Sequence, residues 1–230
     1  MNMTTFDFGY GPVPAHKHPN GGGWVADTAT VADTAYVGSD ARVYGNAKVL
    51  DNAQVFDDAR VTDNAQVFDD AQVYGNAWVY GDAQVSGNAW VFGNAIVNAQ
   101  VYGNAWVYDD AQVYGNARVS GDAEVYGNAI VSGSAWVFGN AQVYGDAQVY
   151  GNAIVSGSAQ VLDNAQVLDN TWVLDDARVS GNARVTDNAR VTDNAQIFGD
   201  VYGKAEVSGE VEEDMFIEMN GKRYKLVEVE

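Results

Sequence analysis

The sequence predicts an all-β protein, a single-stranded parallel β-helix in which short strands wind into three-sided coils. The chain repeats Val-x-(Gly/Asp)-(Asn/Asp)-Ala-x every six residues from about Val25 to Val207, and its Val column is almost unbroken. Helices and coiled coils need periods near 3.6 or 3.5 residues, so neither fits this repeat. Three repeats close one coil, and about ten coils stacked at roughly 4.8 Å predict a rod on the order of 50 Å long.

Each position of the repeat has a physical reason. Val suits a tightly packed pleated surface because its side chain branches at Cβ. Its two neighbours, such as Gln72 and Tyr74 around Val73, are expected to point outward because side chains alternate along a strand. Gly-Asn and Asp-Asn are turn dipeptides, since Gly and Asn tolerate the left-handed backbone of a corner. Ala is small enough to re-enter a crowded interior, so we expect a core of Val and Ala columns.

The predicted domains are a cap or arm at residues 1–24, the β-helix at residues 25–209 and a C-terminal element at residues 210–230. The first segment holds all three prolines and three consecutive glycines, which indicates an irregular cap. In the last segment, Asn220-Gly221 between two strand-like runs predicts a β-hairpin that pairs Met219 with Lys222, Glu218 with Arg223 and Ile217 with Tyr224. The apolar face of this hairpin is expected to cap the last coil or to serve oligomerisation, and it consists of Met215, Ile217, Met219, Tyr224 and Leu226.

Two repeats are shorter than the others. Residues 97–100 and 197–200 form units of four residues, each lacking two. Three effects are open for them: they tighten a corner, bend the array or offset one face.

The repeat has a family resemblance. Val-Tyr-Gly-Asn-Ala-Trp at residues 101–106 and its siblings resemble the hexapeptide repeat of left-handed parallel β-helix proteins. The resemblance covers about Val25 to Val207 and implies left-handed, triangular coils; the hand comes from the resemblance, because crossovers between parallel strands are ordinarily right-handed. The clean repetition and the start Phe8-Gly9-Tyr10-Gly11-Pro12 are similar in style to uncharacterised phage and prophage members.

The enzymes of that superfamily depend on histidine. Its γ-class carbonic anhydrases use three His ligands for their metal, and its acyltransferases use a His as general base. The repeats contain no His, and His16 and His18 in the N-terminal arm are expected to be solvated or hydrogen-bonded. Paired acids such as Asp57 and Asp58 are expected to join hydrogen-bonded ladders rather than calcium sites. The sequence therefore predicts no catalytic residue, no cofactor, no metal and no enzymatic activity.

The chain is strongly acidic. It has 31 Asp and Glu against 12 Lys and Arg, a net charge of −19 and a pI near 4.1. Such a surface repels nucleic acid and anionic lipid and attracts basic proteins, although solubility alone is an alternative reason for it. With no Cys, no signal-like segment and no long apolar run, we expect a cytoplasmic protein, in the host cytoplasm if phage-encoded. The predicted acidic surface consists of Asp69, Asp70, Asp82, Asp109, Asp110, Asp122 and Glu124.

Aromatic side chains gather on one side of the predicted coils. Steps of eighteen residues, with the four-residue unit at 97–100 counted as one full side, place Phe or Tyr after Val on successive coils, and Trp90 and Trp106 before Val on two of them. A ladder within the chain would explain the Tyr stripe, whereas clustered Trp side chains indicate an interface. We expect self-association through this side, and the predicted surface consists of Trp78, Trp90, Phe92, Trp106, Tyr108, Tyr126 and Tyr144.

These features favour a non-catalytic, acidic binding protein that acts by shape and charge. Nucleic-acid mimicry is the mode we expect, and the phage-like resemblance implies inhibition of a host defence or nucleic-acid-handling protein. The expected partners are a basic host protein and further copies of the chain, with no direct binding of nucleic acid or membrane. The alternative is a structural, self-assembling solenoid in a fibre, virion or scaffold; ice binding and carbohydrate binding are lesser alternatives.

Overall fold

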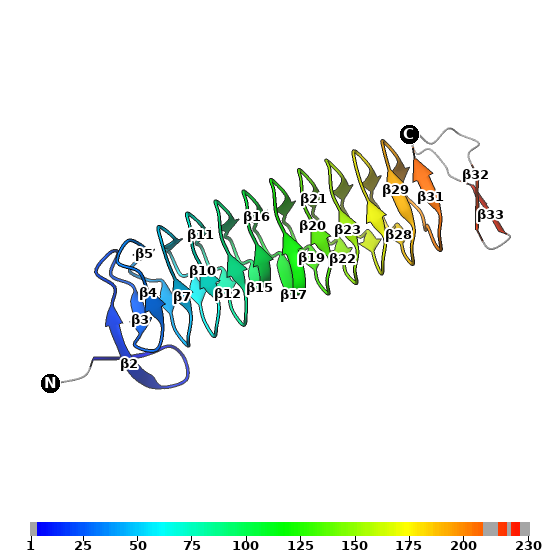
Figure 1. Ribbon diagram of the computed structural model, residues 1–230. Coiled ribbons are helices and arrows are strands. Elements are labelled where there is room, and N and C mark those ends of the chain that lie inside the picture. Colours follow the sequence, from blue (N-terminus) through cyan, green and yellow to red (C-terminus); the bar gives the residue numbers. More distant parts are fainter. Residues whose placement is uncertain (1–3, 209–215, 220–221, 226–230) are drawn as a thin grey trace. The chain divides into compact units, whose positions relative to one another are not determined.

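The computed structural model describes residues 4–208, 216–219 and 222–225, and these contain strands and turns without a helix. The chain divides into two compact units, Met1–Val113 and Tyr114–Glu230, and the boundary falls within β17 (Gln112–Val119). Each unit is a parallel β-solenoid (Figure 1). In the regular coils of both units, each repeat contributes one short strand, which pairs in parallel with the strand eighteen residues further on. The predicted fold class is confirmed in this form, while the left-handed sense stays a prediction.

In unit 1 the coils have three sides. Apart from the long strand at residues 96–101, two of these sides are built of two-residue strands. One of these is the aromatic side, formed by β5 (Tyr36–Val37), β8 (Gln54–Val55), β11 (Gln72–Val73), β14 (Trp90–Val91) and β16 (Trp106–Val107). The second consists of β4 (Thr30–Val31), β7 (Lys48–Val49), β10 (Gln66–Val67) and β13 (Gln84–Val85). The third consists of β3 (Trp24–Ala26), β6 (Arg42–Val43), β9 (Arg60–Val61) and β12 (Trp78–Val79), and β15 (Ile96–Val101) joins the third side to the second.

Unit 2 is built in the same way. Its first side consists of β18 (Glu124–Val125), β21 (Gln142–Val143), β24 (Gln160–Val161), β27 (Arg178–Val179) and β30 (Gln196–Ile197). Its second consists of β19 (Ile130–Val131), β22 (Gln148–Val149), β25 (Gln166–Val167) and β28 (Arg184–Val185). Its third continues from the end of β17 through β20 (Trp136–Val137), β23 (Ile154–Val155), β26 (Trp172–Val173), β29 (Arg190–Thr192) and β31 (Glu206–Ser208).

The interior of both units is the predicted pair of Val and Ala columns. Val73 and Ala77 in unit 1, and Val143 and Ala147 in unit 2, are 0% exposed. Thr171 takes an Ala position and is equally buried, and its hydroxyl donates a hydrogen bond to the Val185 carbonyl at 3.4 Å. A hydroxyl is tolerated in this interior because it finds a carbonyl acceptor there.

Residues that follow Val point away from the interior, but many of them are not exposed. Thr62, Leu162, Leu168 and Ser180 lie at this position and are between 2% and 4% exposed. Stacking at one coil per strand spacing brings equivalent side chains together, so each covers its neighbours. Pointing outward, as predicted, therefore does not make this position exposed.

The corner backbone differs from the expectation in one respect. The residue with positive φ is the first of the corner dipeptide, such as Gly75 (φ 70°) or Asp57 (φ 54°), and not the Asn that follows. Gly adopts this conformation without a Cβ clash, and Asp does so more readily than most residues because its short side chain can hydrogen-bond locally. Gly and Asp therefore share one corner position for one backbone reason.

The N-terminal segment is more regular than its proline and glycine content predicts. β1 (Thr5–Asp7) pairs antiparallel with β2 (Pro12–Lys17), and β2 pairs antiparallel with β3 of the first coil. The turn between β1 and β2 is closed by Asp7, whose Oδ1 accepts hydrogen bonds from the N–H groups of Gly9 and Gly11 at 2.8 and 2.9 Å. These N–H donors lower the pKa of the Asp7 carboxyl.

The short repeat at residues 97–100 removes a corner. β15 runs through it as a six-residue strand, so the chain passes from one side of the coil to the next without the usual turn dipeptide. In the preceding coil the Asn64 N–H donates to the Gly81 carbonyl of the next corner at 2.9 Å. At the missing corner the Asp82 N–H donates instead to the Asn98 side-chain oxygen at 3.3 Å. A side-chain amide thus replaces the lost backbone acceptor.

The C-terminal hairpin is confirmed in its strands. β32 (Phe216–Met219) and β33 (Lys222–Lys225) are antiparallel, with Ile217 opposite Tyr224 and Met219 opposite Lys222, as the Asn-Gly loop predicts. Met215 and Leu226 of the predicted apolar face lie outside the described residues. The cap or oligomerisation role of this face stays a prediction.

Candidate interaction surface

The aromatic side of unit 1 carries a stacked ladder of rings. Phe56, Tyr74, Phe92 and Tyr108 follow Val on successive coils, their ring centroids are 4.8, 4.8 and 4.9 Å apart, and their planes differ by 1° to 3°. This spacing is the separation of neighbouring strands, so the register of the Val column sets the ladder. Burial raises the pKa of the Tyr74 phenol, and the charge of Asp57 raises it further.

A second column of rings lies beside this ladder. Trp90 and Trp106 stack at 5.0 Å with planes 2° apart, and they meet Tyr74 and Phe92 edge to face at 6.3 and 6.4 Å. The contiguous patch of Trp90, Phe92, Trp106 and Tyr108 therefore exists as predicted. Trp106 is 38% exposed although its ring is stacked. The Trp90–Trp106 stack covers one face of each of these two rings.

Trp78 does not belong to this patch. It lies on β12, which pairs with β9 and β15 on another side of the coil, and its ring contacts Tyr80 at 4.9 Å. Grouping Trp78 with Trp90 was wrong because these residues are two repeats apart, and two repeats are two-thirds of a coil.

Unit 2 carries a shorter ladder of its own. Tyr126 and Tyr144 stack at 4.8 Å with planes 3° apart. The same column continues as Leu162, 4% exposed, and Ser180, 2% exposed. The column therefore changes from aromatic residues to Leu and then Ser within this unit.

The corners of both units carry carboxylates held in place by the backbone. An Asp with positive φ accepts a hydrogen bond on Oδ2 from the N–H of the equivalent residue one coil further on. Asp57 accepts from Gly75 at 3.2 Å, Asp69 from Gly87 at 3.0 Å and Asp163 from Gly181 at 3.0 Å. The pKa of Asp169 is lowered by the Thr186 hydroxyl, at 2.5 Å, and by the Asp187 N–H. These bonds orient the acidic groups.

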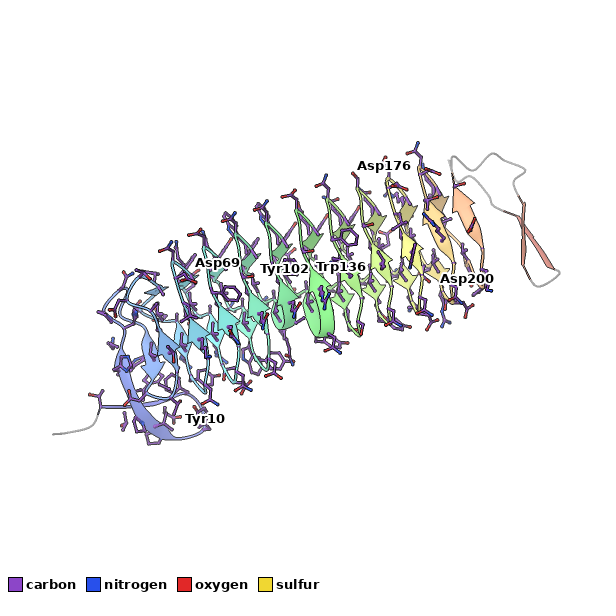
Figure 2. All side chains as sticks on the ribbon, in the orientation of Figure 1. Tyr10, Asp69, Tyr102, Trp136, Asp176 and Asp200 are labelled. Carbon is purple, nitrogen blue, oxygen red and sulfur yellow. The ribbon has the colours of Figure 1, made fainter. Side chains whose placement is uncertain are left out.

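The second corner residue forms the ladder that the sequence predicts. The Asn76 side-chain N–H donates to Asn94 at 3.1 Å, and Asn94 donates to Asp110 at 3.0 Å. Asn donates towards the next coil, whereas Asp has no donor, so a run of the ladder that reaches Asp ends there. Asp176 at this position lies at the outer edge of its coil (Figure 2).

The predicted acidic residues are spread over different corners. In unit 1, Asp69 and Asp70 lie between β10 and β11, Asp82 between β12 and β13, and Asp109 and Asp110 between β16 and β17. All five are exposed, and Asp70 and Asp82 accept hydrogen bonds from Asn52 and Asn64. Acid charge in this unit thus lines three corners and does not form one flat face.

In unit 2, Asp122 is an exposed corner residue between β17 and β18. Glu124 is half-buried on β18 opposite Gln142.

The two histidines of the N-terminal segment differ in burial and in hydrogen bonding. The Nδ1 of His16 lies 2.9 Å from an Asp27 carboxylate oxygen, and both residues are exposed. His18 is 3% exposed, its Nε2 lies 3.2 Å from the Ala32 carbonyl oxygen, and its Nδ1 is buried without a hydrogen-bond partner. Burial lowers the pKa of His18, and the His16 charge lowers it further. Within the described residues, no three His, Asp or Glu side chains converge as metal ligands do.

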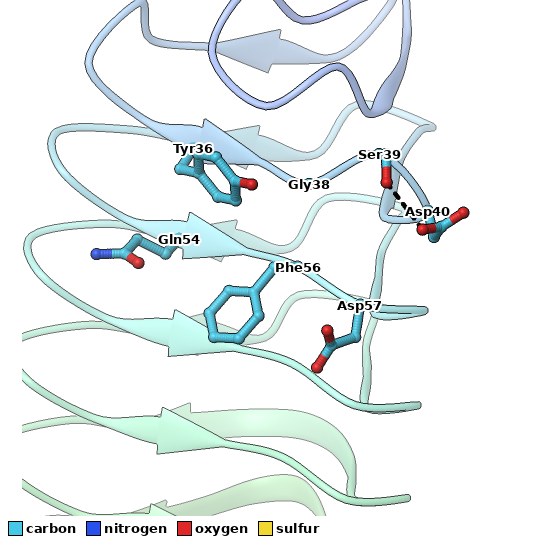
Figure 3. Close-up of a pocket in the computed structure, with 7 residues that line it drawn as sticks. All are labelled: Tyr36, Gly38, Ser39, Asp40, Gln54, Phe56 and Asp57. Carbon is cyan, nitrogen blue, oxygen red and sulfur yellow. Dashed lines mark hydrogen bonds between the residues drawn. The ribbon is translucent and has the colours of Figure 1, made fainter.

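One pocket was not predicted. It has a volume of about 300 Å³ and lies on the aromatic side near β5 and β8, where Tyr36, Gly38, Asp40, Phe56 and Asp57 line it (Figure 3). The signal for it was present in the sequence, because Gly38 stands where the next three coils have Phe56, Tyr74 and Phe92.

The expectation that the chain does not bind a membrane can be compared only with the helix content of the structure. Across the described ranges no helix is long and apolar enough to cross a bilayer.

Comparison with known proteins identifies the repeat. The family model of the YdcK β-solenoid repeat matches nine stretches of the chain, which together include more than half of the 230 residues. The matched stretches are 53–69, 71–87, 83–98, 99–113, 111–125, 123–139, 141–157, 147–163 and 177–193. No curated protein matches the chain. The chain therefore belongs to the YdcK β-solenoid repeat family.

Proposed function

We propose that this protein is a non-catalytic binding protein that recognises a basic partner through oriented corner carboxylates. The observation that carries the proposal is a set of Asp side chains held at positive φ with one oxygen bound to the next coil, as in Asp57 and Asp69. Orienting a charged group before binding reduces the entropy lost when a partner arrives. Because the repeats hold no His, the His bases and metal ligands of the enzymes that the repeat resembles have no counterpart in them.

The finer form of the proposal is nucleic-acid mimicry. Between Arg60 and Arg178 the sequence has thirteen acids and one basic residue, Arg118. Repeated negative charge of this kind attracts the basic grooves that proteins use for nucleic acid. The phage-like style of the sequence extends this to inhibition of a host defence or nucleic-acid-handling protein in the host cytoplasm.

The test is retention of nucleic-acid-binding proteins on the immobilised chain. Proteins from a bacterial lysate are bound at low salt, and duplex DNA is then used as the eluting competitor. We expect DNA and salt to release the same basic proteins, since counterion release makes such binding salt-dependent. The matched control replaces six of the positive-φ acids that are bound to the next coil with their isosteric amides: Asp51, Asp57, Asp63, Asp69, Asp163 and Asp175 each become Asn. Equal retention by the control column would contradict the proposal.

A second candidate is self-assembly through the aromatic side of unit 1. The observation that favours it is Trp106, which keeps 38% of its surface exposed beside the stacked Trp90. Light scattering is expected to show an oligomer that Trp106→Gln converts to a monomer. Trp172→Gln is the control, because Trp172 is 43% exposed but contacts Arg190 in unit 2. A wild-type monomer at micromolar concentration would exclude this candidate.

A further inference from the structure

The pocket on the aromatic side of unit 1 is a missing rung in the aromatic ladder. Strand β5 pairs with β8 so that Val37 lies opposite Val55, which places Gly38 next to Phe56 in the column. A Cβ added at Gly38 would lie 3.0 Å from the Phe56 Cβ, so the two backbones are close. Gly38 nevertheless supplies no ring where the next coils supply three.

The missing rung leaves one face of Phe56 without a stacked ring. Tyr74 covers its other face at 4.8 Å, and the described residues supply no second ring partner. Tyr36 lies at the edge of the same space, 38% exposed (Figure 3). An aromatic face open to a pocket can accept a flat group or a cation.

Two carboxylates lie on the corner side of this pocket. The Ser39 hydroxyl donates to Asp40 Oδ2 at 2.8 Å, and the Gly75 N–H donates to Asp57 Oδ2 at 3.2 Å. Each carboxylate is exposed, and these bonds occupy one oxygen of each. None of the residues that line the pocket is basic. The site thus combines a free ring face with two negative charges.

We propose that this pocket binds the guanidinium group of an arginine side chain from a partner protein. The planar guanidinium stacks on the free face of Phe56 in place of the missing rung, and its N–H donors pair with Asp40 and Asp57. Guanidinium is weakly hydrated, stacks on aromatic rings and donates from a rigid fork, whereas the ammonium of lysine is compact and strongly hydrated. An apolar ligand would strip water from two carboxylates without replacing its hydrogen bonds.

This inference deepens the proposed function, because it names the group on the basic partner that the chain recognises. It makes a prediction that diffuse charge attraction does not make. Charge alone treats arginine and lysine alike, but a stacking site discriminates between them.

The experiment measures the anisotropy of fluorescein-labelled hexa-arginine and hexa-lysine peptides titrated with the full chain at one salt concentration. We expect hexa-arginine to bind about fivefold more tightly than hexa-lysine. The double variant Asp40→Asn, Asp57→Asn is expected to remove this preference. Asn keeps the oxygen that accepts from Ser39 or Gly75 and tolerates the corner backbone, so the variant is expected to fold.

The matched control is the double variant Asp69→Asn, Asp82→Asn. Asp69 has positive φ and accepts an N–H bond from the next coil, as Asp57 does, and Asp82 is a second corner residue, as Asp40 is. This control removes the same charge outside the pocket and is expected to keep the preference for arginine. A third variant, Phe56→Leu, removes the ring face and is expected to abolish the preference with all charges retained.

The outcomes separate the two proposals. Equal binding of both peptides, weakened equally by both double variants, would overturn the arginine pocket and leave the acidic binding function in place. If neither peptide binds at low salt, both proposals are overturned. As an independent check, N-acetyl-arginine amide is expected to shift the backbone amide NMR signals of Gly38 and Gln54 more than those of residues at the control corners, and a uniform response would count against the site.

Discussion

The interior of the coils and their corners are built from the same six-residue repeat, but they tolerate different variation. Val73 and Ala77 are fully buried and belong to columns that scarcely change along the chain. At the corners, the position with positive φ is Gly75 in one coil and Asp57 in the previous one. The interior is restricted by volume, because every side chain packs on its equivalents in neighbouring coils. The corner is restricted by backbone conformation, which both Gly and Asp satisfy.

This difference indicates which positions of the repeat can differ for function. Charge varies at the corners without disturbing the core, and the residues after Val vary between rings, small polar groups and Gly. The candidate sites, namely the oriented carboxylates, the stacked rings and the pocket at Gly38, all lie at these variable positions.

The largest effect is expected in the interior. Val73→Ala removes two methyl-sized groups from a fully buried column and is expected to lower the free energy of unfolding by about 2 kcal/mol. Gln72→Ala, on the adjacent outward position, is the control and is expected to change it by less than about 0.5 kcal/mol. Urea denaturation followed by circular dichroism measures both, and similar losses would show that volume does not restrict the interior more than the exterior.

The corner backbone gives the next effect. Gly75→Ala places a Cβ at positive φ and 2.9 Å from the Gly93 carbonyl oxygen, so we expect a loss of about 2 kcal/mol. Gly181 has φ 67° but no atom within 4 Å of the added Cβ. Gly181→Ala is therefore expected to cost about 1 kcal/mol, from backbone strain alone. Thermal unfolding of the two variants gives the comparison, and a smaller loss at Gly75 would contradict the coil-to-coil contact.

The missing corner at residues 97–100 gives a smaller effect. Asn98→Ala removes the acceptor of the Asp82 N–H and is expected to cost about 1 kcal/mol. Asn98→Asp keeps an acceptor oxygen and is expected to restore most of this stability. Asn76→Ala, which removes only an exposed side-chain bond to Asn94, is the control and is expected to cost less than Asn98→Ala. Urea unfolding midpoints measure all three, and equal losses for the two Ala variants would show that Asn98 does not replace a corner.

The smallest effect concerns the N-terminal segment and depends on pH. Burial keeps the pKa of His18 below its usual 6.5, with His16 lowering it further and Asp33 acting in the opposite direction. The unfolded chain therefore binds the proton more readily, and the stability of this segment is expected to fall as pH drops below about 6.5. Hydrogen exchange of residues 16–38, corrected for intrinsic rates, is expected to increase between pH 7.5 and 5.5.

Two variants make this result specific. His18→Phe removes the titrating group and is expected to abolish the change with pH, while His16→Gln, at an exposed residue, is expected to retain most of it. Unchanged pH dependence in His18→Phe would place the effect elsewhere.

Much of the fold followed from the sequence because each six-residue repeat specifies its own strand, corner and core positions. The period predicted parallel strands at steps of eighteen residues, and Val73 and Ala77 lie in the core as expected. The aromatic patch of Trp90, Phe92 and Trp106 was predicted from the same step, with the short unit at residues 97–100 counted as one side. The Asn-Gly loop predicted the pairing of Met219 with Lys222. The N-terminal segment was less predictable, because Pro12 and Pro14 lie in an antiparallel strand that composition alone does not indicate.

The repeat by itself determined the interior columns, the stacking register and the total acidity, since each depends only on which residue recurs at which step. Tertiary structure decided what happens between coils. It buried Leu168 at a position expected to face outward, bound one oxygen of Asp57 to the next coil, and left a pocket where Gly38 meets Phe56. These outcomes depend on the side chain one coil away, and a single repeat does not specify its neighbour.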